Sequence, residues 1–275
     1  MNYYCLIAGL PDISPDDNHP PFGIVPFREE VYPQLSHNDR LPIDLFYRKF
    51  DNLNLLRYLK NKDAPFDSRG MLDKEELEAC LRLAGESDRP DNPYFPPYYH
   101  DFVEAYRQQG SDETAHWENR LAESYYRQAM NCNNGVVSRW FAFNLNLNNV
   151  LSAHATRKYG METDAVGDNE VAQAVRTSAQ RDMGLTGVLD ELDDWLRIAD
   201  ESDCFEREKK IDLLKWKWLD EATFFKYFSI ESIFAWLVKL DIIERWSMLD
   251  AAEGGKIFRE LTEKLKNDAV NKNVK

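Results

Sequence analysis

The chain has 275 residues, of which 43% are hydrophobic and 13% aromatic, so it is long and apolar enough to bury a core. Its 34 basic and 48 acidic side chains give a formal charge of -14 at pH 7. Because nucleic acid is also a polyanion, this charge disfavours nucleic acid as a partner.

All twelve prolines lie before residue 98. A proline inside a helix costs about 3 kcal/mol, so the proline-free remainder can form uninterrupted helices. We therefore expect a proline-rich N-terminal region with short helices over residues 1–97 and a helical domain over residues 98–275. The expected fold class is all-α, a multi-helix bundle or funnel-like helical array with a less regular N-terminal region.

The first elements are short. Residues 3–10 are too few and too aromatic to distinguish a strand from a helical turn. An extended, turn-rich stretch over residues 11–42 precedes a predicted helix over 44–60. Another helix should begin at Asp73, where Asp73 and Glu76 have the spacing of a capping box, and end near Gly85.

Apolar residues spaced three and four apart predict eight further helices, with ends uncertain by about two to four residues. Gly110, Gly135 and Gly160 each follow such a stretch, where a left-handed closing residue is common. The predicted helices cover residues 98–109, 112–131, 136–159, 169–182, 186–201, 205–227, 230–246 and 252–270.

Aromatic residues are dense between residues 214 and 246, and most of them are expected in the core. Trp216 and Trp218 are about 200° apart on a helix. Both cannot face one core, so at least one should be exposed or docked on another element. The other aromatic residues of this stretch are Phe224, Phe225, Tyr227, Phe228, Phe234, Trp236 and Trp246.

Asparagines are concentrated in residues 144–149, inside the predicted helix over 136–159. Asparagine is a mediocre helix former, so the packing around these side chains must compensate. Asn144 and Asn148 share a face with Val137 and Phe141. We expect Asn144 and Asn148 to form a buried polar network, an interpretation we favour over a ligand site.

No sequence motif for nucleotide binding, a nucleophile elbow or a zincin site is present. The histidines lack the spacing that would let two of them share a metal. The sequence thus predicts no catalytic, cofactor or metal site. The histidines are His19, His37, His100, His116 and His154.

The four cysteines lie far apart, without the paired spacing of zinc sites or redox dithiols, which fits a reducing cytoplasm. Beyond the opening residues, the longest fully apolar run covers only residues 233–238. Spanning a bilayer takes roughly 20 apolar residues. We therefore expect a cytoplasmic chain with no membrane span.

Two stretches resemble a repeated helix of a known protein. Residues 50–57 (Phe-Asp-Asn-Leu-Asn-Leu-Leu-Arg) and 145–151 (Leu-Asn-Leu-Asn-Asn-Val-Leu), the latter continuing to residues 157–160 (Arg-Lys-Tyr-Gly), are similar to the D-x-x-N-L-x-x-x-L-R type helices of the d-type stalk subunit of rotary V/A-type ATPases. The opening residues 3–11, together with 228–231 and 239–246, resemble an uncharacterised bacterial family usually encoded among V/A-type ATPase subunits, in place of a recognisable d-type subunit.

This resemblance implies a role rather than a reaction. The chain would be a non-catalytic coupling subunit whose partners are the stalk and membrane-ring subunits, which would place it in the cytoplasm, peripheral to the inner membrane. The contact residues would be cationic or aromatic and lie on helices. The candidates are Arg57, Lys60, Arg157, Lys158, Trp216 and Trp218.

Two other classes of function remain open. A helical enzyme would need an unrecognised histidine or carboxylate site, for which His100 with Asp101, or His154 beside Asn148 and Asn149, are the natural candidates. A scaffold for an unrelated protein partner is the third hypothesis.

Overall fold

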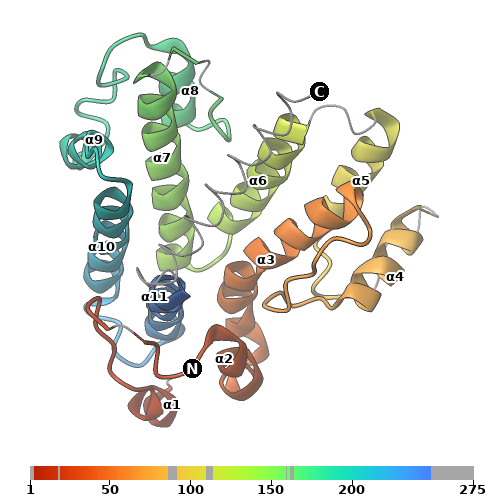
Figure 1. The fold of residues 1–275 in the computed structure, drawn as a ribbon. Helices are drawn as coiled ribbons and strands as arrows, with labels where there is room; N and C mark the ends of the chain where they lie inside the picture. Colours follow the sequence, from red (N-terminus) through yellow and green to blue (C-terminus); the bar gives the residue numbers. More distant parts are fainter. Residues whose placement is uncertain are drawn as a thin grey trace, which may run out of the picture.

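The structure is a computed structural model that describes residues 3–17, 19–85, 92–109, 114–158, 160–161 and 164–248 (Figure 1). Within these residues the regular elements are eleven α-helices and two short 3-10 helices, with no strand. The predicted all-α fold class is therefore confirmed.

The N-terminal region contains more helix than its prolines suggested. The ambiguous opening residues form a short helix, and α3 begins four residues earlier than predicted. Pro42 is tolerated because it lies in the first turn of α3, where its missing N–H has no intrahelical partner to lose. The elements are α1 (Tyr4–Gly9), α2 (Ile24–Glu30), the 3-10 helices Tyr32–Gln34 and His37–Asp39, α3 (Arg40–Lys60) and α4 (Lys74–Gly85).

The capping box predicted before α4 is present. The backbone N–H of Glu76 donates to Asp73 Oδ1 at 2.8 Å, and the backbone N–H of Asp73 donates to Glu76 Oε2 at 3.0 Å. Each side chain thus satisfies a backbone donor that the first helical turn leaves without a partner.

The later helices follow the predicted order. Five of them match the predicted ranges to within a few residues, whereas α8 and α9 are much shorter than expected. The predicted helix over 252–270 lies outside the described residues. The elements are α5 (Pro97–Gln109), α6 (Thr114–Met130), α7 (Gly135–Lys158), α8 (Glu170–Thr177), α9 (Leu192–Ala199), α10 (Cys204–Thr223) and α11 (Ile230–Met248).

The shortening of α8 and α9 has a backbone cause. Residues 178–191 form bends and turns instead of the predicted helical ends. Ser178 is extended, with φ -86° and ψ 131°, and ends α8, whereas Gly187, inside the predicted helix over 186–201, has φ 82°, in the left-handed region that a right-handed helix cannot contain. Met183 and Gly184, between the two predicted helices, are also left-handed, with φ values of 57° and 69°. Gly160, with φ 66°, closes α7 as predicted, whereas Gly135 is the first residue of α7. Gly110 lies outside the described residues.

The core is continuous across the predicted boundary at residue 97. In its largest cluster, buried residues of α2 and α3 join residues of α7 and α11, among them Phe27, Tyr47, Phe141 and Phe234. A second cluster joins the end of α3 to α4, α5 and α6. In Figure 1, α6 and α7 lie near the centre, with α9 and α10 on one side and α3, α4 and α5 on the other.

The molecule has two distinguishable ends. The C-terminal ends of α3 and α7 point toward the upper part of Figure 1, whereas α1 and the turn between α10 and α11 lie at the lower end. Within the described residues, no helix combines the length and apolar composition needed to cross a membrane.

Candidate functional site

The predicted contact residues on α3 are accessible. Arg57 and Lys60 lie in the last turn of the helix, and both are exposed. Lys60 Nζ pairs with Glu118 Oε1 of α6 at 2.9 Å, an exposed pair of small energetic value. Arg57 is therefore the clearer candidate for contact with a partner.

The two predicted cations at the end of α7 differ in their surroundings. Lys158 is exposed. Arg157 instead donates three hydrogen bonds to backbone carbonyl oxygens after α7, at 2.9 Å to Val175, 2.6 Å to Ser178 and 2.7 Å to Gln180. Arg157 thus holds the end of α8 and the turn after it, which is a structural role.

The two predicted contact tryptophans pack against other helices. Trp216 is buried beside Ile242 and Ile243 of α11. Trp218 is partly buried against α7, where its ring stacks on Phe143 with centroids 5.3 Å apart. The expectation that at least one of them would be exposed or docked on another element is confirmed by Trp218, which packs on α7. The use of Trp216 as a contact residue is wrong because its side chain is buried, whereas Trp218 is only partly buried and stays a prediction.

The predicted buried pair of asparagines is also wrong. Asn148 is exposed, and Asn144 is partly buried and donates to the carbonyl oxygen of Trp140 in its own helix at 3.0 Å. The buried asparagine of this run is Asn149. The three-and-four spacing defines a face only to within about one residue, so it selected the neighbour of the buried side chain.

Asn149 holds the segment that follows α7. Its Nδ2 donates to the carbonyl oxygen of Val166, and its Oδ1 accepts from the backbone N–H of the same residue, both at 2.9 Å. One turn earlier, Asn146 Oδ1 accepts from Asn169 Nδ2 at 2.8 Å. Asn169 in turn caps α8 by accepting from the N–H of Ala172 at 2.9 Å. We call Asn146 and Asn149 the α7 anchor.

The same arrangement recurs on α3. Asn54 Nδ2 donates to the carbonyl oxygen of Asp67, and Asn54 Oδ1 accepts from the N–H of Asp67, both at 2.8 Å. One turn earlier, Asp51 Oδ1 accepts from the N–H groups of Met71 and Leu72 at 2.9 and 3.1 Å, just before α4. We call Asp51 and Asn54 the α3 anchor.

The two anchors have corresponding positions and roles. In each anchor, the first side chain fixes the residues before the next helix. An asparagine three positions further along the chain then hydrogen-bonds to both the N–H and the carbonyl oxygen of a single residue. These positions are the Asp/Asn and the Asn, three residues apart, of the two stretches over residues 50–57 and 145–151. The motif in this chain is therefore a device that fastens a helix to the segment after it.

The α3 anchor contains a buried carboxylate with arginines nearby. Burial raises the pKa of Asp51 to about 6, although the N–H of Leu72 and the charge of Arg48 act in the opposite direction. Arg48 is buried and donates to the carbonyl oxygen of Tyr94 at 2.6 Å. Arg28 donates to the carbonyl oxygens of Ser68 and Gly70. Arg28 thus fixes the same segment as the carboxylate, whereas Arg48 fixes residue 94 before α5.

The two histidines that are the alternative candidates of the enzyme hypothesis each lie beside a carboxylate. His154 Nε2 lies 3.0 Å from Asp200 Oδ1, and Asp200 also pairs with Arg181. His100 Nδ1 lies 3.5 Å from Asp101 Oδ1 on another part of the molecule. Among the described residues, no group of three histidine, cysteine or acidic side chains is placed to hold a metal ion.

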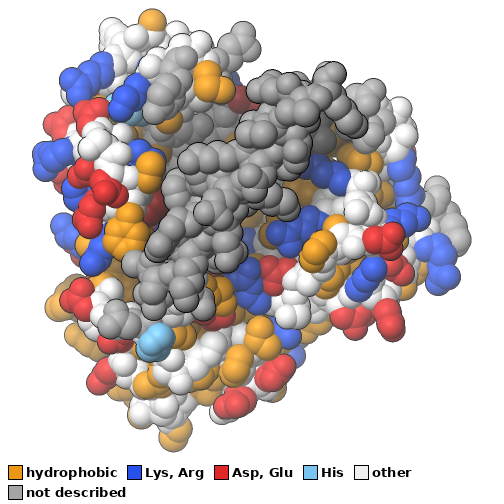
Figure 2. Space-filling view, in the orientation of Figure 1, with side chains coloured by type: hydrophobic (Ala, Val, Ile, Leu, Met, Phe, Trp, Pro, Cys, Tyr) orange, Lys and Arg blue, Asp and Glu red, His pale blue; other side chains and the backbone are white. Residues whose placement is uncertain are grey.

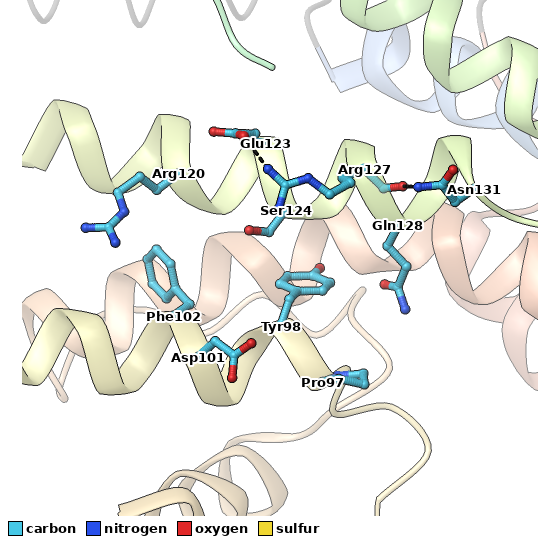
Figure 3. A pocket seen from close by; sticks show the side chains of 10 residues that line it. All are labelled: Pro97, Tyr98, Asp101, Phe102, Arg120, Glu123, Ser124, Arg127, Gln128 and Asn131. Atoms are coloured by element: carbon cyan, nitrogen blue, oxygen red, sulfur yellow. Dashed lines mark hydrogen bonds and ion pairs between the residues drawn. The ribbon is translucent and has the colours of Figure 1, made fainter. Parts of the chain in front are cut away.

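A pocket of about 550 Å³ lies between α5 and α6 (Figure 3). Its charged groups have partners, since Arg127 pairs with Glu123 and Arg120 lies over the Trp117 ring at 4.6 Å. The buried Oε1 of Gln128 has no hydrogen-bond partner. The lining residues are Pro97, Tyr98, Asp101, Phe102, Arg120, Glu123, Ser124, Arg127, Gln128 and Asn131.

An exposed aromatic surface was not predicted from the sequence, from which most of the aromatic residues between 214 and 246 were expected in the core. The surface lies at the lower end of the molecule in Figure 1 and comprises Tyr4 of α1 with Phe224, Phe225, Tyr227 and Phe228 of the α10–α11 turn. The prediction extended the helix over 205–227 too far: α10 ends at Thr223, so the four rings after it lie in the turn before α11 instead of on a helix face. The closeness of these four residues to the junction between the two predicted helices was the signal available in the sequence.

Comparisons with known proteins identify the family of the chain. No curated protein and no solved structure matches it. Residues 1–269 match the family DUF2764, whose description is "Protein of unknown function (DUF2764)". Because the match covers nearly the whole sequence, the chain belongs to the DUF2764 family.

Proposed function

We propose that the chain is a non-catalytic coupling subunit of a V/A-type ATPase. In this role it links the central stalk to the membrane rotor, in the cytoplasm and peripheral to the inner membrane. Its partners are the stalk and membrane-ring subunits. The single observation that best supports the proposal is the repetition of one fastening device in the α3 and α7 anchors.

The anchors connect the resemblance to a physical role. The resemblance to the d-type stalk helices depends on two short motifs, and each motif holds the segment after its helix. The α3 anchor does so through four hydrogen bonds and the α7 anchor through three. A helix fastened in this way moves together with the next helix. Such rigid helix–loop–helix units suit a subunit that transmits force between partners.

The exposed cations on the anchored helices are the proposed contact points. Arg57 lies in the last turn of α3 and Lys158 ends α7, and both helices run toward the upper part of Figure 1. In a chain of net charge -14, two accessible cations can recognise acidic groups of a partner.

The proposal is tested by purifying a tagged chain from its native host in mild detergent and identifying the proteins recovered with it. We expect catalytic and stalk subunits of the ATPase in near-equal amounts. Recovery of the chain without ATPase subunits would reject the coupling role.

Charge reversal then tests the contact points. Arg57→Glu and Lys158→Glu should together reduce recovery of ATPase subunits at least tenfold and leave the thermal unfolding of the isolated chain unchanged. Lys209→Glu, which reverses an exposed charge on α10, is the matched control. Equal losses in the control would reject the assignment to α3 and α7. Arg157 is unsuitable for this test because its substitution breaks three hydrogen bonds within the chain.

A further inference from the structure

We propose that the aromatic surface rests on the headgroup region of a lipid bilayer and holds the molecule there without spanning the membrane. The surface is the one defined above, namely Tyr4 with Phe224, Phe225, Tyr227 and Phe228. This inference does not depend on the coupling role, because it concerns the purified chain and lipid alone.

The rings of this surface stand clear of the fold. Phe225 is 82% exposed and Tyr227 is 62% exposed, far above the usual exposure of large apolar side chains. Exposed apolar side chains gathered in one place mark an interaction site, whereas single ones need no explanation. In Figure 2, hydrophobic side chains are visible at this lower end of the molecule.

The aromatic surface is also held in place. The backbone N–H of Tyr3 donates to the carbonyl oxygen of Phe228 at 2.8 Å, and the rings of Tyr4 and Phe228 lie with centroids 4.4 Å apart. Tyr3 itself is buried, and its hydroxyl donates to Asp39 Oδ2 at 2.6 Å. These contacts fix α1 against the α10–α11 turn, so the rings are presented together.

Polar and charged groups are sparse on this surface. The six residues of α1, Tyr-Cys-Leu-Ile-Ala-Gly, include no charged side chain. The only charge within the run 224–228 is Lys226, whose Nζ lies 3.8 Å from Glu231 Oε1. Two further ion pairs flank the turn, Lys217 with Glu221 and Lys239 with Asp220. The surface is therefore close to neutral.

These features favour a bilayer over a protein partner. A specific protein interface carries about one hydrogen bond per 100–200 Å² and a shape matched to its partner. Here projecting rings carry few hydrogen-bonding groups, and a fluid lipid surface can adapt to such rings. Aromatic side chains with a polar tip, such as Tyr4 and Tyr227, are favoured at the membrane–water interface.

The net charge of the chain disfavours two of the molecules that could bind the aromatic surface. Two copies of a chain with net charge -14 repel each other, which disfavours a second copy on this surface. The same charge repels anionic lipid. A zwitterionic bilayer meets the neutral aromatic surface without this penalty, so we expect stronger binding to zwitterionic than to anionic vesicles, most clearly at low salt.

The test is flotation of the full-length chain with phosphatidylcholine vesicles. We expect the wild type to float, and Phe225→Ser combined with Tyr227→Ser to lower its partition coefficient at least tenfold. Phe205→Ser is the matched control, because Phe205 is half exposed but lies at the opposite end of α10, and it should change partition less than twofold. Phe225→Trp should retain or increase partition, since tryptophan favours the interface.

Several outcomes would overturn the proposal. Two of them are failure of the wild type to float and equal flotation of the double variant. Flotation only with vesicles containing phosphatidylglycerol would assign binding to other groups. A dimer in light scattering that the double variant abolishes would identify a second copy as the occupant. Thermal unfolding of each variant checks that it is folded, and none of these results depends on ATPase subunits.

Discussion

Asp51 combines near-complete burial with a carboxylate oxygen, Oδ2, that has no hydrogen-bond partner. Its other oxygen accepts from two backbone N–H groups, so the side chain is structurally necessary while its charge is unfavourable. Burial accordingly raises its pKa from 3.8 to about 6. This residue makes stability depend on pH in a predictable direction.

Between about pH 4 and pH 6, the unfolded chain loses the Asp51 proton before the folded chain does. The unfolded state then binds fewer protons, so this residue's contribution to the unfolding free energy decreases as pH rises through that window. Asp51→Asn keeps an acceptor for the two N–H groups and removes the titration. We expect the stability of the variant relative to wild type to increase by about 2 to 3 kcal/mol from pH 4 to pH 6.5. Urea unfolding at both values measures it, and a pH-independent difference would contradict it.

Gly70 is required by its approach to Asp51. A Cβ at this position would come closer to Asp51 Oδ1 than real Cβ atoms approach a neighbour. Asp51 cannot move away without losing its hydrogen bonds to Met71 and Leu72. Gly70→Ala should therefore lower the unfolding free energy by about 1–3 kcal/mol in urea titrations.

The control for this substitution is Gly135→Ala. There an added Cβ meets only Arg139 Nη1, at an ordinary contact distance of 3.8 Å. At the start of a helix, alanine should leave stability unchanged or raise it by less than about 1 kcal/mol. Equal destabilisation by both substitutions would reject the steric explanation.

Residue-level prediction from the sequence succeeded where a local spacing determines the geometry. The capping box of Asp73 and Glu76 involves neighbouring atoms only, and it forms as expected. The burial of Asn149 rather than Asn148 depends on where residues 164–169 return against α7, which local spacing does not contain. Arg157 is similar, because its acceptors belong to α8 and the turn after it.

At the scale of elements, helices with long periodic apolar faces were predictable and their connections were not. The segment 178–191 has apolar residues at helical spacing, yet three left-handed residues interrupt it. The exposed turn 224–228 was expected in the core because apolarity alone does not state which way a side chain points. Tertiary contacts decide both cases.

The two asparagines of α7 offer a direct test of the anchor. Asn149→Ala leaves the N–H and carbonyl of Val166 without partners, so we expect a loss of about 2–4 kcal/mol. Asn148→Ala removes only one long contact, 3.4 Å to the Tyr126 hydroxyl, and should change stability by less than about 0.5 kcal/mol. Thermal and urea unfolding of both variants measure the difference. Similar losses would show that the anchor contributes nothing specific.

At the scale of the whole molecule, the prolines suggested a division at residue 97. The largest core cluster nevertheless draws residues from both sides, including Phe46 and Tyr47 from α3 and Phe141 and Phe234 from α7 and α11. A fragment of residues 98–275 would expose the surfaces that α2 and α3 cover. Proline distribution describes local conformation and carries no information on which helices share a core.

We expect that fragment to retain helical far-ultraviolet circular dichroism but to lack a cooperative unfolding transition, because the core loses part of its partners. The full chain should unfold in one transition with coincident far- and near-ultraviolet signals. Cooperative unfolding of the fragment would instead establish the region after residue 97 as a unit that folds alone.

The anchors also bear on the order in which the chain folds. Asn54 and Asp67 are 13 residues apart, and Asn149 and Val166 are 17 apart, so each contact closes a short loop at a small entropic cost. By contrast, the N–H of Ile24 donates to the carboxylate of Glu244, which lies 220 residues later in the chain. In pulsed hydrogen exchange during refolding, the amides of Asp67 and Val166 should therefore gain protection earlier than that of Ile24, with two local nuclei preceding closure of the common core.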